Sequence, residues 1–163
     1  MLQNIQQCRK DIPQGSEIVM AKISRREARE ILAGLLFETE FRSDEDINGI
    51  FALACEDRDI PDNDYIRRGY FGIYDNAVQI DEMIGKHSKG WKTERMSRMS
   101  RSVLRLCVYE MLFEKDIPYS VSINEAIELT KKFDDEKARP FVNGILNSVK
   151  NELESLAAGE TEK

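Results

Sequence analysis

The sequence predicts an all-α protein of about seven helices, arranged in two packed sub-bundles of three to four helices each. Apolar residues recur at the spacing of helical faces along most of the chain, and no segment shows the alternation of a convincing strand. Capping patterns, in which a serine is followed three residues later by an acid, precede several of these segments. Proline and glycine separate them at intervals that suit short loops between helices.

Size, charge and composition narrow the class of protein. A chain of 163 residues can bury a core in one domain. We expect this domain over 20–156, with a disordered extension or translated leader at 1–19 and a polar tail at 157–163. The net charge of −6 argues against broad attraction to nucleic acid, although not against a local basic patch.

The cysteines and the apolar runs indicate a cytoplasmic protein. The three cysteines show no metal-ligand spacing, so we expect reduced thiols. No apolar run approaches the length of a transmembrane helix. Residues 1–19 lack the apolar core of a signal peptide.

The first half of the chain is expected to form one antiparallel three-helix unit. Two capping boxes and a proline–aspartate pair mark the helix starts, namely Ser24 with Glu27, Ser43 with Asp46, and Pro61 with Asp62. The helices are expected to cover about 24–41, 44–56 and 62–87. Leucine and isoleucine residues on the first of them form an apolar face.

The second half is organised around a helix over about 97–114. Leu104, Cys107, Val108 and Met111 lie on one face of it, and further apolar residues lie off that face, so other helices should surround it. We predict a short helix at 93–96 before it. After it we predict a helix that begins at a third capping box, Ser122 with Glu125, and ends near residue 133.

The last helix is expected to begin at 137–140 and to fade near residue 156. Gly144 lies inside it and lowers its intrinsic stability relative to alanine. This glycine indicates a close approach between helices, and Asn143 beside it is a candidate for a hydrogen bond across the bundle.

Two blocks of the chain resemble the NusB transcription-antitermination family. The C-terminal block comprises Val103-Leu-Arg-Leu, Tyr109-Glu, Ile117-Pro, Val121-x-Ile-Asn-Glu-Ala-Ile-Glu-Leu and Phe141-Val-Asn-Gly-Ile-Leu. The N-terminal block, Ser24-Arg-Arg-Glu-Ala-Arg-Glu, is similar to the arginine-rich first helix of that family. The resemblance covers Met20 to about Lys150.

This resemblance implies an RNA-binding adaptor rather than an enzyme. Such a protein would pair with the ribosomal protein NusE and bind the single-stranded boxA sequence of nascent ribosomal RNA. It would thereby help the transcription elongation complex to pass terminators. Some NusB-like proteins self-associate, so a homodimer is a further possible state.

The basic residues at the start of the first helix are the main candidates for RNA binding. They are Lys22, Arg25, Arg26 and Arg29, and we expect the arginines to lie on the exposed side. Spacing alone favours a solvated helix face with charge pairs, such as Arg26 with Glu30. The resemblance reverses this preference, because in NusB-like proteins this segment contacts RNA.

The resemblance also implies a second RNA contact and a protein contact. Lys137, Arg139 and Phe141, at the start of the last helix, are the candidates for the RNA contact. The alternative there is a solvated helix start over a core phenylalanine. Trp91, Glu94 and Arg98 are the candidates for the contact with NusE. A tryptophan beside methionines is otherwise more typical of the edge of a core.

No residue pattern favours catalysis or a bound cofactor. His87 has no convincing nucleophile in the sequence, and Cys107 lies in the middle of the central helix. The acids at 134–136 could hold a metal, but acids are also common at helix starts. Two other interpretations remain open: a protein-only helical scaffold, and a stand-alone NusB-like domain related to rRNA cytosine methyltransferases.

Overall fold

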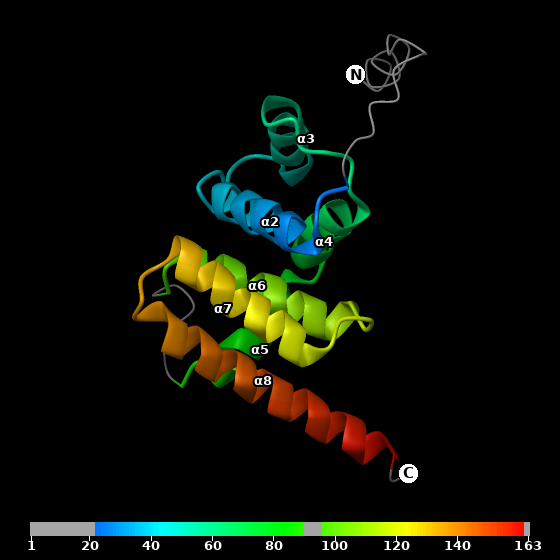
Figure 1. The fold of residues 1–163 in the computed structure, drawn as a ribbon, viewed down its shortest axis with the longest axis vertical. Helices are drawn as coiled ribbons and strands as arrows, with labels where there is room; N and C mark the ends of the chain where they lie inside the picture. The colour runs from blue at the N-terminus through cyan, green and yellow to red at the C-terminus, as the bar shows by residue number, and fades with distance from the viewer. Residues whose placement is uncertain (1–21, 90–95, 162–163) are drawn as a thin grey trace.

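The computed structural model describes residues 22–89 and 96–161, and these residues form seven helices and no strand (Figure 1). The helices are α2 (Arg25–Glu40), α3 (Ile47–Asp57), α4 (Asp64–Asp75), α5 (Ala77–His87), α6 (Arg98–Phe113), α7 (Tyr119–Phe133) and α8 (Ala138–Thr161). The predicted all-α class is confirmed. The predicted extension at 1–19 lies outside the described residues, as does the predicted short helix at 93–96 apart from Met96.

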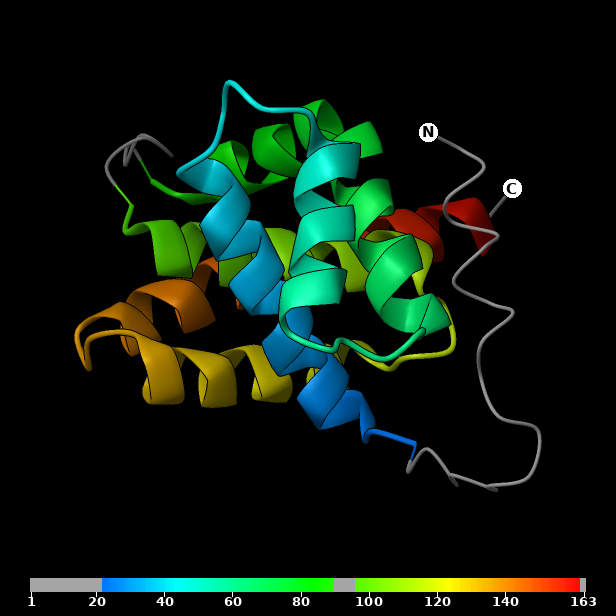
Figure 2. The same ribbon diagram turned by 90° about the horizontal axis from the view of Figure 1, so that it is seen from above.

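Helix α6 lies at the centre of the molecule. It packs against α2 and α4 on one side and against α5, α7 and α8 on the other (Figures 1 and 2). Side chains on all sides of α6 are buried, among them Val103, Leu104 and Cys107. The expectation that other helices surround this segment is therefore confirmed.

The single helix predicted over 62–87 is wrong, because the chain breaks at Asn76. This residue ends α4 and begins α5, with a backbone φ of −112° and ψ of 19°. Its backbone N–H and its side-chain amide both donate to the carbonyl of Gly72, at 3.1 Å and 2.7 Å. These bonds satisfy the end of α4 and let α5 turn away to pack on α6 and α8. The first group of helices is thus α2–α4, and the second is α5–α8.

Close helix approach occurs at Gly72, not at Gly144. A Cβ atom on Gly72 would lie 2.7 Å from the ring of Tyr109 on α6, so any larger residue would force this ring to shift. Gly144 is exposed and has open space around it. The prediction for Gly144 is therefore wrong. The predicted bond of Asn143 across the bundle is also wrong, because its side chain accepts from Asn147 one turn along the same helix.

The structure confirms one of the three predicted capping boxes. Ser24 and Glu27 bond reciprocally at the start of α2. Helix α3 is instead capped by Asp46 itself, which accepts from the backbone N–H of Gly49 at 3.2 Å. Helix α7 begins directly after Pro118, which leaves Ser122 buried inside the helix. Helix α8 also runs five residues further than predicted, to Thr161.

Candidate nucleic-acid interface

The first turn of α2 presents basic side chains on the surface. Lys22, Arg25 and Arg26 are exposed, and for the two arginines this confirms the prediction. The guanidinium of Arg25 lies over the ring of Tyr65, 4.2 Å from its centroid. Arg26 donates two hydrogen bonds to Glu125 of α7, at 3.1 Å and 2.9 Å, rather than pairing with Glu30. Both arginines are therefore held in place by side chains of other helices.

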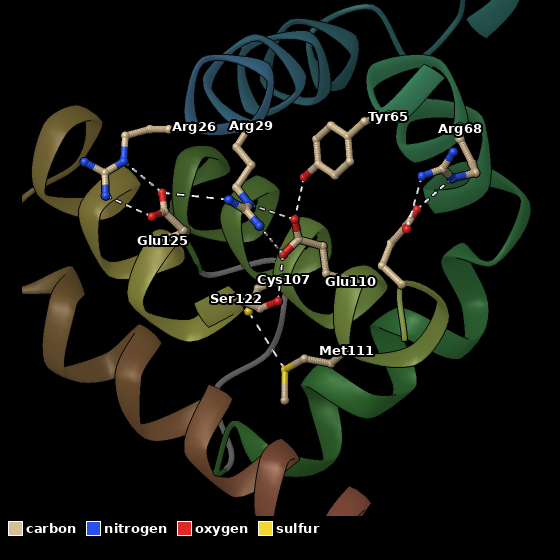
Figure 3. A network of polar contacts seen from close by, with 10 residues as sticks. Arg26, Arg29, Tyr65, Arg68, Cys107, Glu110, Met111, Ser122 and Glu125 are labelled. Atoms are coloured by element: carbon tan, nitrogen blue, oxygen red, sulfur yellow. Dashed lines mark hydrogen bonds and ion pairs between the residues drawn. The ribbon is translucent and has the colours of Figure 1, made fainter. Parts of the chain in front are cut away.

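Arg29 is buried, so the prediction that it lies on the exposed side is wrong. Only 4% of this residue is exposed, and its Nε donates to the carboxylate of Glu110 on α6 at 2.7 Å (Figure 3). A buried guanidinium needs such a partner, because an unpaired charge in the core is strongly destabilising. Arg29 lies three and four residues before Leu32 and Ala33, both of them buried, and this spacing could have placed it on the apolar face.

The buried carboxylate of Glu110 connects four helices. Besides Arg29 of α2, it accepts from the hydroxyl of Tyr65 on α4 at 2.5 Å and from that of Ser122 on α7 at 2.7 Å. Burial and the adjacent Glu110 charge raise the pKa of Tyr65 far above its usual value, so its hydroxyl stays protonated. We call Arg29, Tyr65, Glu110 and Ser122 the Glu110 cluster. It fixes the start of α2 relative to α4, α6 and α7.

An open groove of about 760 Å³ runs between the start of α2 and helices α7 and α8. We call it the arginine groove, because Arg26 and Arg139 line its two sides. These residues come from the two separate segments predicted to contact RNA. Glu125, Glu128 and Glu136 also line the groove, so its charge is mixed.

Lys137 and Phe141 line a separate hollow of about 300 Å³ beside the start of α6. Phe141 is half-buried and packs against the core, as the alternative of a core phenylalanine expected, and its contact with RNA stays a prediction. Asp134 borders the same hollow and accepts hydrogen bonds from the hydroxyls of Ser97 and Ser100, each at 2.6 Å. In the sequence Asp134 is only one member of an acidic run, because its serine partners lie more than 30 residues away.

Of the three residues predicted to contact NusE, the structure describes Arg98; Trp91 and Glu94 lie outside the described residues. The guanidinium of Arg98 lies 4.1 Å from the ring centroid of Phe41, whose side chain is largely exposed at the end of α2. Nearby, Glu40 accepts from Arg105 at 2.8 Å and lies 3.4 Å from Arg101. No sequence pattern points to Phe41 or Glu40, because their contacts with α6 are formed only in the folded chain.

The described residues contain no cluster of His, Cys, Asp and Glu that could hold a metal ion. Cys107 is fully buried, and burial raises the pKa of its thiol well above the usual value. His87 contacts Glu152 of α8. Within residues 22–89 and 96–161, no helix is long and apolar enough to cross a membrane.

Comparison with known proteins places this arrangement in a family. The transcription antitermination protein NusB of Clostridium botulinum (strain Kyoto / Type A2) is 41% identical over 142 residues, which cover 78% of this chain and 99% of that protein. The solved structure of T. maritima NusB superposes with a TM-score of 0.74 at 41% identity, covering 80% of this chain and 93% of that one. These names describe an antitermination protein rather than an enzyme.

A second solved structure includes binding partners. It contains the antitermination factors NusB and NusE in complex with double-stranded RNA, and it superposes with a TM-score of 0.68 at 29% identity. The superposition covers 77% of this chain and 94% of the NusB-like chain in that structure. The NusB family model matches residues 26–151. From the helical arrangement, the match over most of the chain and the identity to these relatives, we conclude that this chain belongs to the NusB family.

Proposed function

We propose that this protein is an RNA-binding transcription antitermination factor of the cytoplasm. In this role it pairs with NusE, binds the boxA sequence of nascent ribosomal RNA and acts on the transcription elongation complex. The observation that carries the proposal is the arginine groove, in which Arg26 and Arg139 face a common space. The solved complex of a relative with NusE and RNA supports the choice of partners.

The chemistry of the groove suits a single RNA strand. Guanidinium groups bind phosphate through two parallel hydrogen bonds and stack on unpaired bases. Arg26 lines the groove on the α2 side, and Arg139 lines it on the α8 side. Arg25 precedes Arg26 on the exposed start of α2, and Lys137 lies two residues before Arg139, in the neighbouring hollow. Arg29 is buried, so we assign it the support of α2 rather than contact with RNA.

The acids in the groove favour a second candidate function, a protein-only scaffold. Arg26 already has a carboxylate partner, and three glutamates line the same space. In the scaffold interpretation the protein binds NusE, and the arginines contribute nothing to RNA affinity. The two functions therefore differ in a measurable way.

The test compares the binding of a labelled boxA RNA by the wild-type protein and by Arg25→Ala/Arg26→Ala, over a series of salt concentrations with and without NusE. If both arginines contact phosphate, affinity falls, and the slope of log affinity against log salt becomes shallower by about 0.7 for each lost contact. The matched control is Lys115→Ala/Lys150→Ala, which removes the same charge from residues that do not line the groove.

The control is expected to keep the wild-type slope. Equal affinity and equal slope in the wild type and the arginine variant would reject the RNA-binding role of α2. If NusE still bound such a variant normally, the scaffold function would replace the proposal.

A further inference from the structure

The loop between α7 and α8 is tied to the first turn of α6 through Asp134. The hydroxyls of Ser97 and Ser100 both donate to its Oδ2 at 2.6 Å. The backbone N–H of Asp135 donates to its Oδ1 at 2.8 Å. One carboxylate therefore joins donors from two segments that lie more than 30 residues apart in the chain.

The surroundings of this carboxylate keep it ionised and in place. Partial burial alone would raise the pKa of Asp134, but the hydrogen bonds from Ser100, Ser97 and the backbone outweigh it and hold the pKa below its usual value. Ser97 also caps α6 by accepting from the backbone N–H of Ser100 at 3.0 Å. A negative charge at the start of a helix is further favoured by the helix dipole.

Candidate binding residues lie on both sides of this link. On the loop side, Lys137 and Arg139 follow Asp134 by three and five residues, and Arg139 lines the arginine groove. On the α6 side, Arg98 directly follows Ser97 and lies over the ring of Phe41. The first turn of α6 thus stands between the region predicted to contact NusE and the loop that carries basic residues toward RNA.

We propose that Asp134 is a positioning residue that couples the binding of a protein partner to the binding of RNA. Contacts at Arg98 stabilise the first turn of α6. Through Ser97 and Ser100 this turn holds Asp134, and with it the loop that carries Lys137 and the first turn of α8 that carries Arg139. The inference rests on the proposed function, because it requires NusE and RNA to bind the same molecule. Coupling of this kind is measured as the factor by which one ligand changes the affinity for the other.

The experiment measures the affinity for boxA RNA with and without saturating NusE in four proteins: the wild type, Ser100→Ala, Asp134→Asn and Asp135→Asn. We expect NusE to tighten RNA binding by the wild type by about 5-fold or more. In Ser100→Ala and Asp134→Asn this factor should fall to within about twofold of unity. Asp135→Asn should keep the wild-type factor.

The variants distinguish a positioning role of Asp134 from an effect of its negative charge and from an effect on folding stability. Ser100→Ala leaves the net charge unchanged, and Asp135→Asn removes the same charge as Asp134→Asn from the neighbouring residue. Thermal unfolding of each variant reports the structural contribution of the link. If Ser100→Ala and Asp134→Asn unfold at lower temperature but keep the wild-type factor, the link is structural and the inference is overturned.

Failure of the inference can be told from failure of the proposed function. A wild-type protein that binds RNA equally well with and without NusE would overturn the inference alone. A wild-type protein that binds no boxA RNA in either condition would overturn the proposed function, and the inference with it.

Discussion

Arg26 and Arg29 lie three residues apart on α2, and each pairs with a carboxylate, one on the surface and the other in the interior (Figure 3). The side chain of Arg26 is 62% exposed and pairs with Glu125, whereas that of Arg29 is 5% exposed and pairs with Glu110. Glu125 lies between them, since one of its oxygens is also 4.0 Å from Arg29. The surface pair and the buried pair are thus neighbours.

One arginine-rich motif thus places its side chains in two unlike environments. A surface pair contributes little to stability, so Arg26 can exchange its carboxylate for a phosphate with little loss. A buried pair is difficult to break, because removing one partner leaves an uncompensated charge in the core. Arg26 is therefore suited to binding, and Arg29 is suited to holding α2 on α6.

The largest expected effect comes from breaking the buried pair. Arg29→Ala leaves Glu110 charged and short of a partner, and we expect it to lower the free energy of unfolding by about 3–5 kcal/mol. Arg26→Ala, the matched control on the same helix, should leave the urea midpoint close to that of the wild type. Urea unfolding followed by circular dichroism measures both. Equal urea midpoints for the two variants would show that the buried ion pair contributes no more to stability than the surface ion pair.

A smaller effect, on RNA affinity, is expected when the surface ion pair is removed by replacing Glu125 while Arg26 is kept. Glu125→Gln removes the carboxylate that competes with RNA phosphate for Arg26, so RNA affinity should rise by about two- to fivefold. The corresponding change in the core, Glu110→Gln, should lower stability and leave the affinity of the folded protein for RNA unchanged. Fluorescence anisotropy with labelled boxA RNA distinguishes the two. Unchanged affinity in Glu125→Gln would mean that the surface pair does not restrain Arg26.

The smallest effect concerns the pH dependence of the surface pair. The hydrogen bond from Arg26 lowers the pKa of Glu125 below its usual value; partial burial opposes this shift, and the charge of Arg26 adds to it. A lowered pKa in the folded state stabilises the protein above the unfolded-state pKa of about 4.3, and this contribution is lost as the pH falls through the folded-state value.

The pH prediction is checked by the difference in melting temperature between the wild type and Arg26→Ala, measured from pH 3 to pH 7. This difference should be constant above about pH 5 and should shrink in acid. A difference that stays constant down to pH 3 would argue that Glu125 does not titrate with a lowered pKa.

The same two arginines show what sequence reasoning can and cannot supply. Helical periodicity predicted the all-α class, the central position of α6 and the basic start of α2, because each follows from local spacing. The burial of Arg29 depends on Glu110, which lies 81 residues away in the chain. The spacing of Arg29 to Leu32 and Ala33 could have placed it on the apolar face, but no local pattern reports the distant carboxylate that allows a charged residue to be buried there.

The other differences between the predictions from sequence and the structure also arise from tertiary contacts. Asn76 breaks a helix that contains no proline at this point, because the chain must turn to bring α5 onto α6 and α8. Ser122 matches a capping pattern but lies inside α7, where its hydroxyl serves Glu110. Lys137 and Arg139 are two residues apart, yet they line different hollows. In each case a residue type that suits a local role is used for a distant contact.

The separation of Arg29 from Glu110 also has a consequence for synthesis on the ribosome. At about 5–20 residues per second, the 81 residues between them take roughly 4–16 s to make. Throughout that interval the nascent α2 carries a cation destined for the interior, and its carboxylate has yet to be translated. The buried pair that holds α2 on α6 can therefore form only after two thirds of the polypeptide has been translated.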